Sequence, residues 1–465
     1  MTVAPPPQRT AQQPATRPRP APQGPGGRRA GLSGLRPRLG LPLNGADRDV
    51  LWLYLLTRVG LWVTSYSVAW IFPSDGEAKR APSALSRWEQ WDWTHFLHIA
   101  QSGYFPDGAG PGTPDWDNRE AFFPGFPLVL RAVHVIVPNW TLAGLLISFV
   151  AGAVAVLALA RIARLHLPGE RVGASVAEST APVPVQRSGK GAAVRAESSA
   201  PENTARASTA SESTAPGMAQ RSVLFLLLSP CAVFLAAGYT EALFLAFALP
   251  AWLAAQRHQW LLAGVLTALA TTVRISGFFV AAAIGVHFLI TAWKARTARA
   301  WRPLPWTVLP ALPAFLYSAY LHAHTGDWMA WKHAQERGWY REFHAPWEAW
   351  KTTWQAAFDG GYSTGYAYMW QAELLAMVVG LVLFGVLIGL RRWPEAVYLG
   401  LSLWALGTSY WFTSVPRATL LWWPLWTLLA AWSLRRPRIR TAYVAVAAPL
   451  MVVFAVSFLS GRWTG

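Results

Sequence analysis

Long apolar runs separated by short polar connections dominate the chain from residue 50 onwards. Many of these runs approach the roughly 20 residues that an α-helix needs to cross a bilayer. Because lipid-exposed backbone must satisfy its own hydrogen bonds, each run is interpreted as a helix. The pattern therefore predicts an all-α polytopic membrane protein. We expect eleven crossings, at about 50–72, 141–160, 223–238, 239–256, 260–273, 275–293, 304–323, 372–390, 396–413, 417–434 and 441–460.

One further apolar segment, 124–137, does not fit this series. It has about 14 residues, which is short for a crossing. If it did cross, the orientation of every later helix would be inverted. We therefore expect a re-entrant or interfacial segment.

Two polar segments divide the chain into its predicted parts. Residues 1–48 hold eight Arg, ten Pro and one acid, and are predicted to be a disordered, basic, cytoplasmic tail. Residues 163–221 are rich in Ala, Ser, Thr and Pro and repeat a short phrase that begins with Glu, so they are predicted to be a disordered cytoplasmic linker. The first spans then occupy 49–162, and the remaining spans occupy 222–460.

The basic residues between the later runs predict the topology. Clusters at 294–302, 391–392 and 435–440 lie at alternate connections, as expected for a common cytoplasmic side. The two long loops, 73–123 and 324–371, then face outward. The first of them carries eight acids against four bases, which agrees with this orientation.

The composition mainly excludes classes of protein and of site. The 465 residues are 53% hydrophobic and only 14% charged, with a mean hydropathy of +0.25, so a cytosolic enzyme is excluded. The net charge of +17 lies in the tail and the short loops, as topology determinants do, and we expect no nucleic-acid partner. The single cysteine, Cys231, gives neither a disulfide nor a cysteine metal site. The Ala/Arg/Pro-rich composition favours a bacterial plasma membrane.

The richest candidate chemistry lies in loop 73–123. A helix beginning near Trp88 would place Asp92, His95 and Ile99 on one face, so a carboxylate and an imidazole could point the same way. The Trp residues around them offer flat apolar faces for a sugar, which makes a carbohydrate site plausible. An interfacial amphipathic helix with an ordinary aromatic belt explains the same pattern. The spacing of His95 with Asp92 gives only a weak metal signal, and no metal site is assigned.

Five short blocks add a resemblance to a known family. In order, they are Trp91-Asp92-Trp93-Thr94-His95-Phe96-Leu97-His98-Ile99-Ala100 with Gly103-Tyr104 and Phe122-Phe123-Pro124-Gly125-Phe126-Pro127, Ser229-Pro230 with Gly238-Tyr239-Thr240-Glu241-Ala242-Leu243-Phe244, Thr272-Val273-Arg274-Ile275-Ser276-Gly277, Gly326-Asp327 with Gln335 and Trp339, and Ser414-Val415-Pro416-Arg417. Together they resemble the PIG-V type mannosyltransferases, the family of GPI mannosyltransferase 2. The resemblance covers about residues 50–435.

The resemblance implies the GT-C architecture, a multi-span glycosyltransferase whose first long outer loop carries the catalytic carboxylate. The implied donor is a polyprenyl-phosphate sugar, with mannose as the expected hexose, and the implied acceptor is a lipid or glycan. The donor reaches the site among the membrane lipids, so no cofactor or nucleotide-binding domain is expected. Asp92 is the expected general base of an inverting reaction. The same blocks place Trp91, His95, Tyr239 and Gln335 among the expected substrate-binding residues.

Three charged residues in or beside apolar runs have two readings each. Glu241 is a second catalytic candidate, or it forms an ion pair with Arg274 or Arg58 that only orients helices. Arg274 and Arg417 are expected ligands of the donor phosphate, because the guanidinium fork suits phosphate, or they are structural. The rival class is a polytopic transporter or lipid flippase. A transporter commonly shows internal repeats, and no hydropathy block is repeated between the two halves.

Overall fold

The computed structural model describes residues 43–72, 84–113, 116–165 and 217–464. Within these ranges the chain forms sixteen bounded α-helices, a further helical stretch at 217–227, short 3-10 helices and no strand, which confirms the all-α prediction. The α-helices are α1 (Gly45–Ile71), α2 (Asp92–Ser102), α3 (Gly125–His134), α4 (Trp140–Leu165), α7 (Thr240–Gln256), α8 (Trp260–Val273), α9 (Ser276–Ala295), α10 (Leu304–Val308), α11 (Ala311–Thr325), α12 (Ala330–Trp339), α13 (Pro346–Phe358), α14 (Thr364–Gly389), α15 (Trp393–Gly407), α16 (Val415–Ala418), α17 (Trp423–Arg435) and α18 (Pro437–Leu459).

Five helical segments are long and apolar enough to cross a membrane, which suggests an integral membrane protein. The shorter helices α7 and α8 are also apolar. The other predicted crossings are helical over shorter or more polar stretches, so the number eleven stays a prediction. The five long segments are Trp140–Leu165, Ser276–Ala295, Ala298–Thr325, Thr364–Gly389 and Pro437–Leu459.

Proline divides several runs that the sequence analysis treated as single helices. The run 304–323 is split between α10 and α11, and Pro310 is the N-cap of α11. The run 223–238 is helical only to residue 227, after which Pro230 precedes a 3-10 turn at Ala232–Leu235. Proline lacks the N–H that a helix needs and clashes with the preceding turn, so these breaks follow from the sequence.

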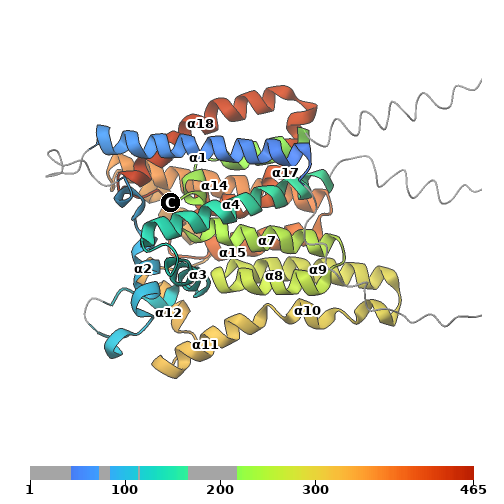
Figure 1. Cartoon of the computed structure of the whole chain (residues 1–465), viewed down its shortest axis with the longest axis horizontal. Coiled ribbons are helices and arrows are strands. Elements are labelled where there is room, and N and C mark those ends of the chain that lie inside the picture. Colours follow the sequence, from blue (N-terminus) through green and yellow to red (C-terminus); the bar gives the residue numbers. More distant parts are fainter. Residues whose placement is uncertain (1–42, 73–83, 114–115, 166–216, 465) are drawn as a thin grey trace, which may run out of the picture. The chain divides into compact units, whose positions relative to one another are not determined.

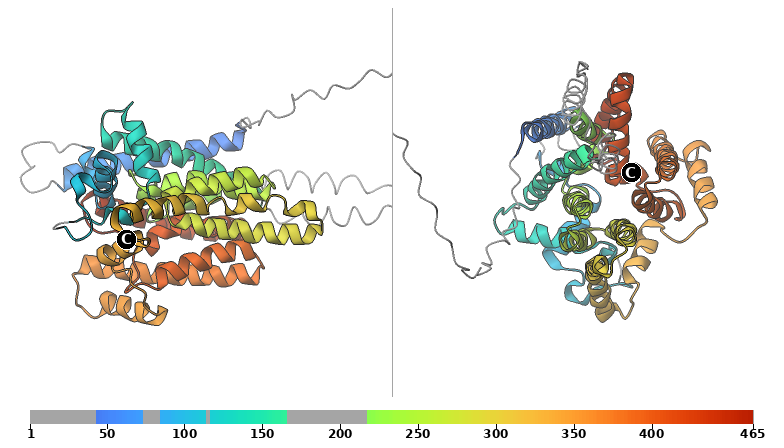
Figure 2. Two further views of the ribbon diagram at one scale, coloured as in Figure 1. Left: turned by 90° about the horizontal axis from the view of Figure 1, so that it is seen from below. Right: turned by 90° about the vertical axis from the view of Figure 1, so that its right-hand side faces the viewer.

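The longer helices run alongside one another, and several are seen end-on in the right-hand view of Figure 2. In Figure 1, α7 lies between α4 and α8. Nearly every residue of α7 is buried, as expected for a helix that is apolar on all sides and surrounded by others. The helices α2, α3 and α12 lie together at one end of the bundle, which is called the loop end below (Figure 1).

The helix α3 covers most of the uncertain segment 124–137. With 10 residues it spans about 15 Å, roughly half of the hydrocarbon core. Phe126 and Leu130 are fully buried against the bundle. The length agrees with a re-entrant or interfacial helix.

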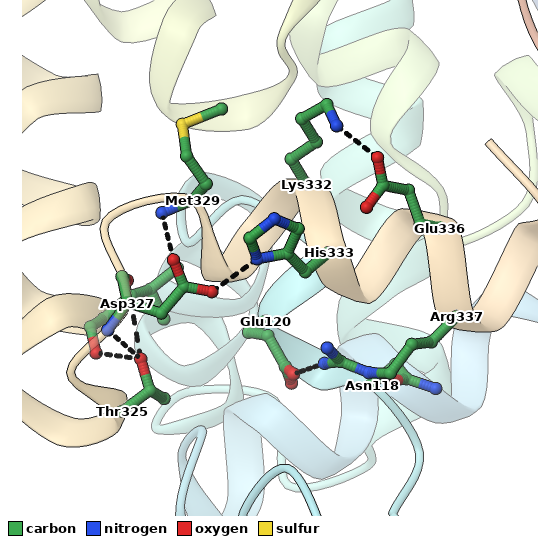
Figure 3. A network of polar contacts seen from close by, with 10 residues as sticks. Asn118, Glu120, Thr325, Asp327, Met329, Lys332, His333, Glu336 and Arg337 are labelled. Carbon is green, nitrogen blue, oxygen red and sulfur yellow. Dashed lines mark hydrogen bonds and ion pairs between the residues drawn. The ribbon is translucent and has the colours of Figure 1, made fainter. Parts of the chain in front are cut away.

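The two long loops fold against each other at the loop end. Arg337, on α12 of the second loop, donates from Nη2 to Glu120 Oε1 (2.6 Å) and from Nε to Asn118 Oδ1 (3.0 Å), both in the first loop. Figure 3 shows this contact beside the pairs Asp327–His333 and Lys332–Glu336. Because Glu120 is fully buried, the ion pair fixes the second loop over the first.

The structure corrects the boundaries of the two polar segments. Asn44 caps α1 by accepting the N–H of Asp47, so residues 45–48 belong to a helix and not to the tail. Residues 163–165 likewise end α4, and 217–221 are helical. The rest of the predicted tail and linker lies outside the described residues.

Candidate functional site

Asp92 is the first residue of α2, not a residue within a longer helix. The helix predicted from Trp88 is wrong: a 3-10 turn covers Ser86–Trp88, and α2 begins at Asp92. Trp91 between them has φ 50° and ψ −117°, a conformation that strongly favours glycine. Such strain persists only where the surroundings enforce it, and it is common at functional sites.

A notch made by two glycines holds the start of α2 in place. A Cβ on Gly144, in α4, would lie 2.5 Å from the ring of Trp93, and so would a Cβ on Gly238. The Trp93 side chain therefore fits between the backbone of α4 and the bend before α7 only because both positions lack a side chain. Since Trp93 follows Asp92 directly, this packing fixes the position of the carboxylate.

Glu241 enters the site from the first turn of α7. Gly238 lies in a non-helical bend, Tyr239 has an extended backbone conformation, and α7 begins at Thr240. Glu241 is fully buried, and its Oε2 has no hydrogen-bond partner in the described structure. The Tyr239 hydroxyl donates to the carbonyl of Gln90 (2.5 Å), which ties α7 to the loop before Asp92.

Two arginines and two carboxylates form one chain of ion pairs. Arg417 donates from Nη1 to Asp92 Oδ2 (2.7 Å) and from Nε to Glu241 Oε1 (2.5 Å). Arg274 donates from Nη1 to the same Glu241 oxygen (2.5 Å) and to the hydroxyl of Thr240 (2.6 Å). The order is therefore Asp92, Arg417, Glu241, Arg274. Charges buried at this depth require such pairing.

The position of Arg417 depends on an acid that the sequence analysis did not use. Both carboxylate oxygens of Glu373, in α14, accept backbone N–H groups, from Ser414 and Val415, each at 2.8 Å. A carboxylate at a helix N-terminus is stabilising, so Glu373 anchors the start of α16. The fully buried Glu373 is the only acid in the predicted run 372–390, and an acid in such a run is a signal that could have identified it.

A cavity of about 740 Å³ opens beside this chain of ion pairs. Its volume lies within the usual range for small-molecule sites. Among its lining residues Asp92 is the only carboxylate, and the Asp92 side chain keeps 22% of its exposure. Much of the wall is aromatic, including Phe122, Phe123, Trp331, Trp339, Trp404 and Trp422.

Most of the predicted site residues meet at this cavity. Its lining includes Trp91, Asp92, Tyr239, Arg274, Gln335 and Arg417. Gln335 also donates to the carbonyl of Ala121 (3.1 Å), which joins the two long loops at the rim. Glu241 lies behind the wall, held by the two arginines.

His95, like Glu241, is a predicted site residue that does not line the cavity. Its ring stacks on Phe122 (centroids 4.8 Å apart) and meets the edge of Trp339 (5.5 Å), so it supports two aromatic wall residues from behind. Burial lowers the pKa of His95, against the opposing influence of Asp92 and Asp117. The neutral ring therefore prevails at neutral pH.

The structure shows which partners the predicted buried charges have. Glu241 does pair with Arg274, as one reading expected, but also with Arg417, which the sequence analysis did not anticipate. Arg58, the other partner considered for Glu241, does not pair with it: the Arg58 guanidinium lies over the ring of Tyr54, 5.0 Å from the centroid. Arg274 and Arg417, expected as phosphate ligands, both hold carboxylates in this structure.

Two basic residues of the cavity wall were missed altogether. Lys332, on α12, and Arg341, just after it, both line the cavity. Both belong to the second long loop, 324–371, which lacks the apolar runs on which the sequence analysis relied. Within the described ranges, no group of three or more His, Cys, Asp or Glu side chains is arranged to hold a metal ion. Comparisons with known protein families, with curated proteins and with solved structures return no match to this chain.

Proposed function

We propose that this chain is a GT-C type membrane glycosyltransferase, similar to the PIG-V type mannosyltransferases. It transfers a hexose, mannose by resemblance, from a polyprenyl-phosphate sugar to a lipid or glycan acceptor in a bacterial plasma membrane. The observation that carries the proposal is Asp92, the single carboxylate in the wall of an aromatic cavity, held at a strained helix start between a loop and a bundle of apolar helices.

The proposed reaction inverts the anomeric centre. The acceptor hydroxyl attacks the anomeric carbon, Asp92 takes the hydroxyl proton, and the bond from that carbon to the phosphate oxygen breaks. Arg417 keeps the Asp92 carboxylate oriented before the proton is transferred. The aromatic walls offer apolar faces to the C–H surfaces of the sugar, and the apolar helices offer a path for the polyprenyl chain.

The direct test is sugar transfer by the purified, full-length protein. The assay supplies a polyprenyl-phosphate [¹⁴C]mannose donor and a lipid extract as acceptor, and follows labelled product by thin-layer chromatography. The wild-type chain should form product, and Asp92→Asn should not. The matched control is Asp359→Asn, which changes an exposed carboxylate of the second loop.

The rival class of transporter or flippase predicts a different outcome. A flippase would move the intact lipid across reconstituted vesicles without releasing polyprenyl phosphate. Translocation without sugar transfer, unaffected by Asp92→Asn, would replace the enzyme proposal. Transfer that survives Asp92→Asn but fails in Glu241→Gln would move the role of the base to Glu241.

A further inference from the structure

Four cationic side chains line the cavity, and three of them already have carboxylate partners. Arg417 and Arg274 hold Asp92 and Glu241, and Lys332 pairs with Glu336. Among the described residues, Arg341 is the lining cation without an ion pair. The one hydrogen bond of its side chain within the described residues runs from Nη2 to the carbonyl of Thr413 (3.3 Å).

The carboxylate that acts most strongly on Arg341 is not free to bind it. This is Glu373, whose two oxygens are occupied by backbone N–H groups at the start of α16. Burial lowers the pKa of Arg341. A guanidinium that has lost water and has no salt-bridge partner gains more than an exposed one from a bound anion.

The backbone holds Arg341 at the cavity by a specific turn. Tyr340, the residue before it, ends α12 in the left-handed conformation (φ 54°, ψ 38°). The Tyr340 carbonyl accepts the N–H of Tyr410 (3.3 Å), and the N–H of His344 is donated to the carbonyl of Thr408 (3.0 Å). The turn is thus fastened to the segment that leads into α16 and Arg417.

We propose that Arg341 is the residue that binds the phosphate of the lipid donor, and that Arg417 and Arg274 position the carboxylates. This assignment rests on the proposed function and differs from the expectation that Arg274 and Arg417 bind phosphate. When the bond between the anomeric carbon and oxygen breaks, its electron pair goes to the phosphate. The singly charged diester becomes a monoester that carries a second negative charge, and Arg341 stabilises that charge.

The first test measures binding without catalysis. The full-length protein in detergent is titrated with polyprenyl monophosphate, with the uncharged polyprenol of the same length, and with inorganic phosphate. We expect the monophosphate to bind roughly 10- to 100-fold more tightly than the polyprenol, as for a charge-assisted hydrogen bond. Arg341→Gln should remove this preference and Arg341→Lys should keep part of it. The control Arg299→Gln, at an exposed position, should keep all of it.

The second test separates phosphate binding from a structural role. In Arg341→Gln the inhibition constant of polyprenyl monophosphate should rise more than the donor KM, because the product carries the extra charge. A merely structural role would change both by the same factor and lower the unfolding temperature.

Four outcomes would overturn or divide the proposals. An unchanged monophosphate preference in Arg341→Gln overturns the assignment, as does a preference lost only in Arg274→Gln. Equally tight competition by inorganic phosphate would show a free-phosphate site and not a lipid headgroup site. Arg341-dependent lipid binding without sugar transfer would refute the enzyme proposal and leave the phosphate site standing.

Discussion

Two buried clusters of charge lie at opposite ends of the bundle, and they differ in what surrounds them. At the loop end, Arg417 lies between Asp92 and Glu241. At the other end, Asp47 of α1 binds two arginines near the end of α4. The helix α4 connects the two regions: it starts beside Trp93 and ends 26 residues, or about 39 Å, away.

Both clusters consist of ion pairs, but only the cluster at the loop end has residues that line the cavity. The Asp47 side chain is 2% exposed and does not line the cavity. Its carboxylate accepts hydrogen bonds from Nη2 of Arg161 (3.2 Å) and from Nη2 of Arg164 (2.7 Å). Its partners project from regular helix. At the loop end, by contrast, residues with left-handed backbone precede the charged groups: Trp91 before Asp92, Tyr340 before Arg341 and Ser414 before Arg417. Ion pairing is therefore common to both clusters, and strained backbone beside a cavity is the feature that supports the loop end as the candidate site.

The largest expected effect is a loss of turnover that follows a change at the loop end. Asp92→Asn should lower turnover by roughly 10²- to 10⁴-fold, because Asn cannot accept the hydroxyl proton. Asn keeps an oxygen for Arg417, so the fold should survive. Donor binding should also persist, since we propose that Arg341, and not Arg417, binds the phosphate. Steady-state transfer kinetics and lipid titration of the same preparation measure both quantities.

The next effect concerns stability at the loop end. Arg417→Met would leave Asp92 without its arginine and the fully buried Glu241 with Arg274 as its one remaining cation among the described residues. Breaking a buried pair in this way costs about 3–5 kcal/mol. We expect a marked fall in the unfolding temperature in detergent. The second variant, Arg417→Met with Asp92→Asn, should recover part of that loss, because it neutralises the carboxylate that has lost its arginine. No recovery would mean that Arg417 acts through its packing between Phe234 and Tyr239.

A local test addresses the glycine notch. Gly238→Ala would place a Cβ 2.5 Å from the Trp93 ring, and overpacking of this kind costs about 1–3 kcal/mol. Because Trp93 adjoins Asp92, turnover should fall along with stability. Gly285→Ala is the matched control, as no atom lies within 4 Å of its added Cβ. Equal activity of the two variants would contradict the positioning role of Trp93.

The sequence predicted an all-α fold and singled out six residues that line the cavity, because both leave local signals. Apolar runs require helices, and an acid or arginine at the end of such a run is unusual enough to be noticed. The pairing itself leaves no local signal: Arg417 and Asp92 are 325 positions apart, and Arg417 and Glu241 are 176 apart. The same limit explains the omission of Arg341, whose segment is polar and becomes informative only when α12 folds over the cavity.

The start of α2 shows a different limit. The sequence around Asp92, which is rich in aromatic residues, is compatible with a helix that begins at Trp88. Helix propensity gives no reason for the helix to begin only after Trp91. Tertiary packing decides the boundary, because the Trp93 ring must enter the notch between Gly144 and Gly238. The strained Trp91 is the consequence, and a single sequence does not reveal it.

The smallest expected effect is at the opposite cluster and completes the comparison. Asp47→Asn keeps an acceptor oxygen but removes the charge that Arg161 and Arg164 share. Both arginines are partly exposed, at 24% and 19%, so water can replace much of what they lose. We expect a loss of about 1 kcal/mol, near the upper end for exposed ion pairs, and a small fall in the unfolding temperature. Turnover, donor KM and the preference for polyprenyl monophosphate should match the wild type. A change in any of these three, at unchanged stability, would show that the two ends are coupled through α4 and that the contrast drawn from cavity and strain is incomplete.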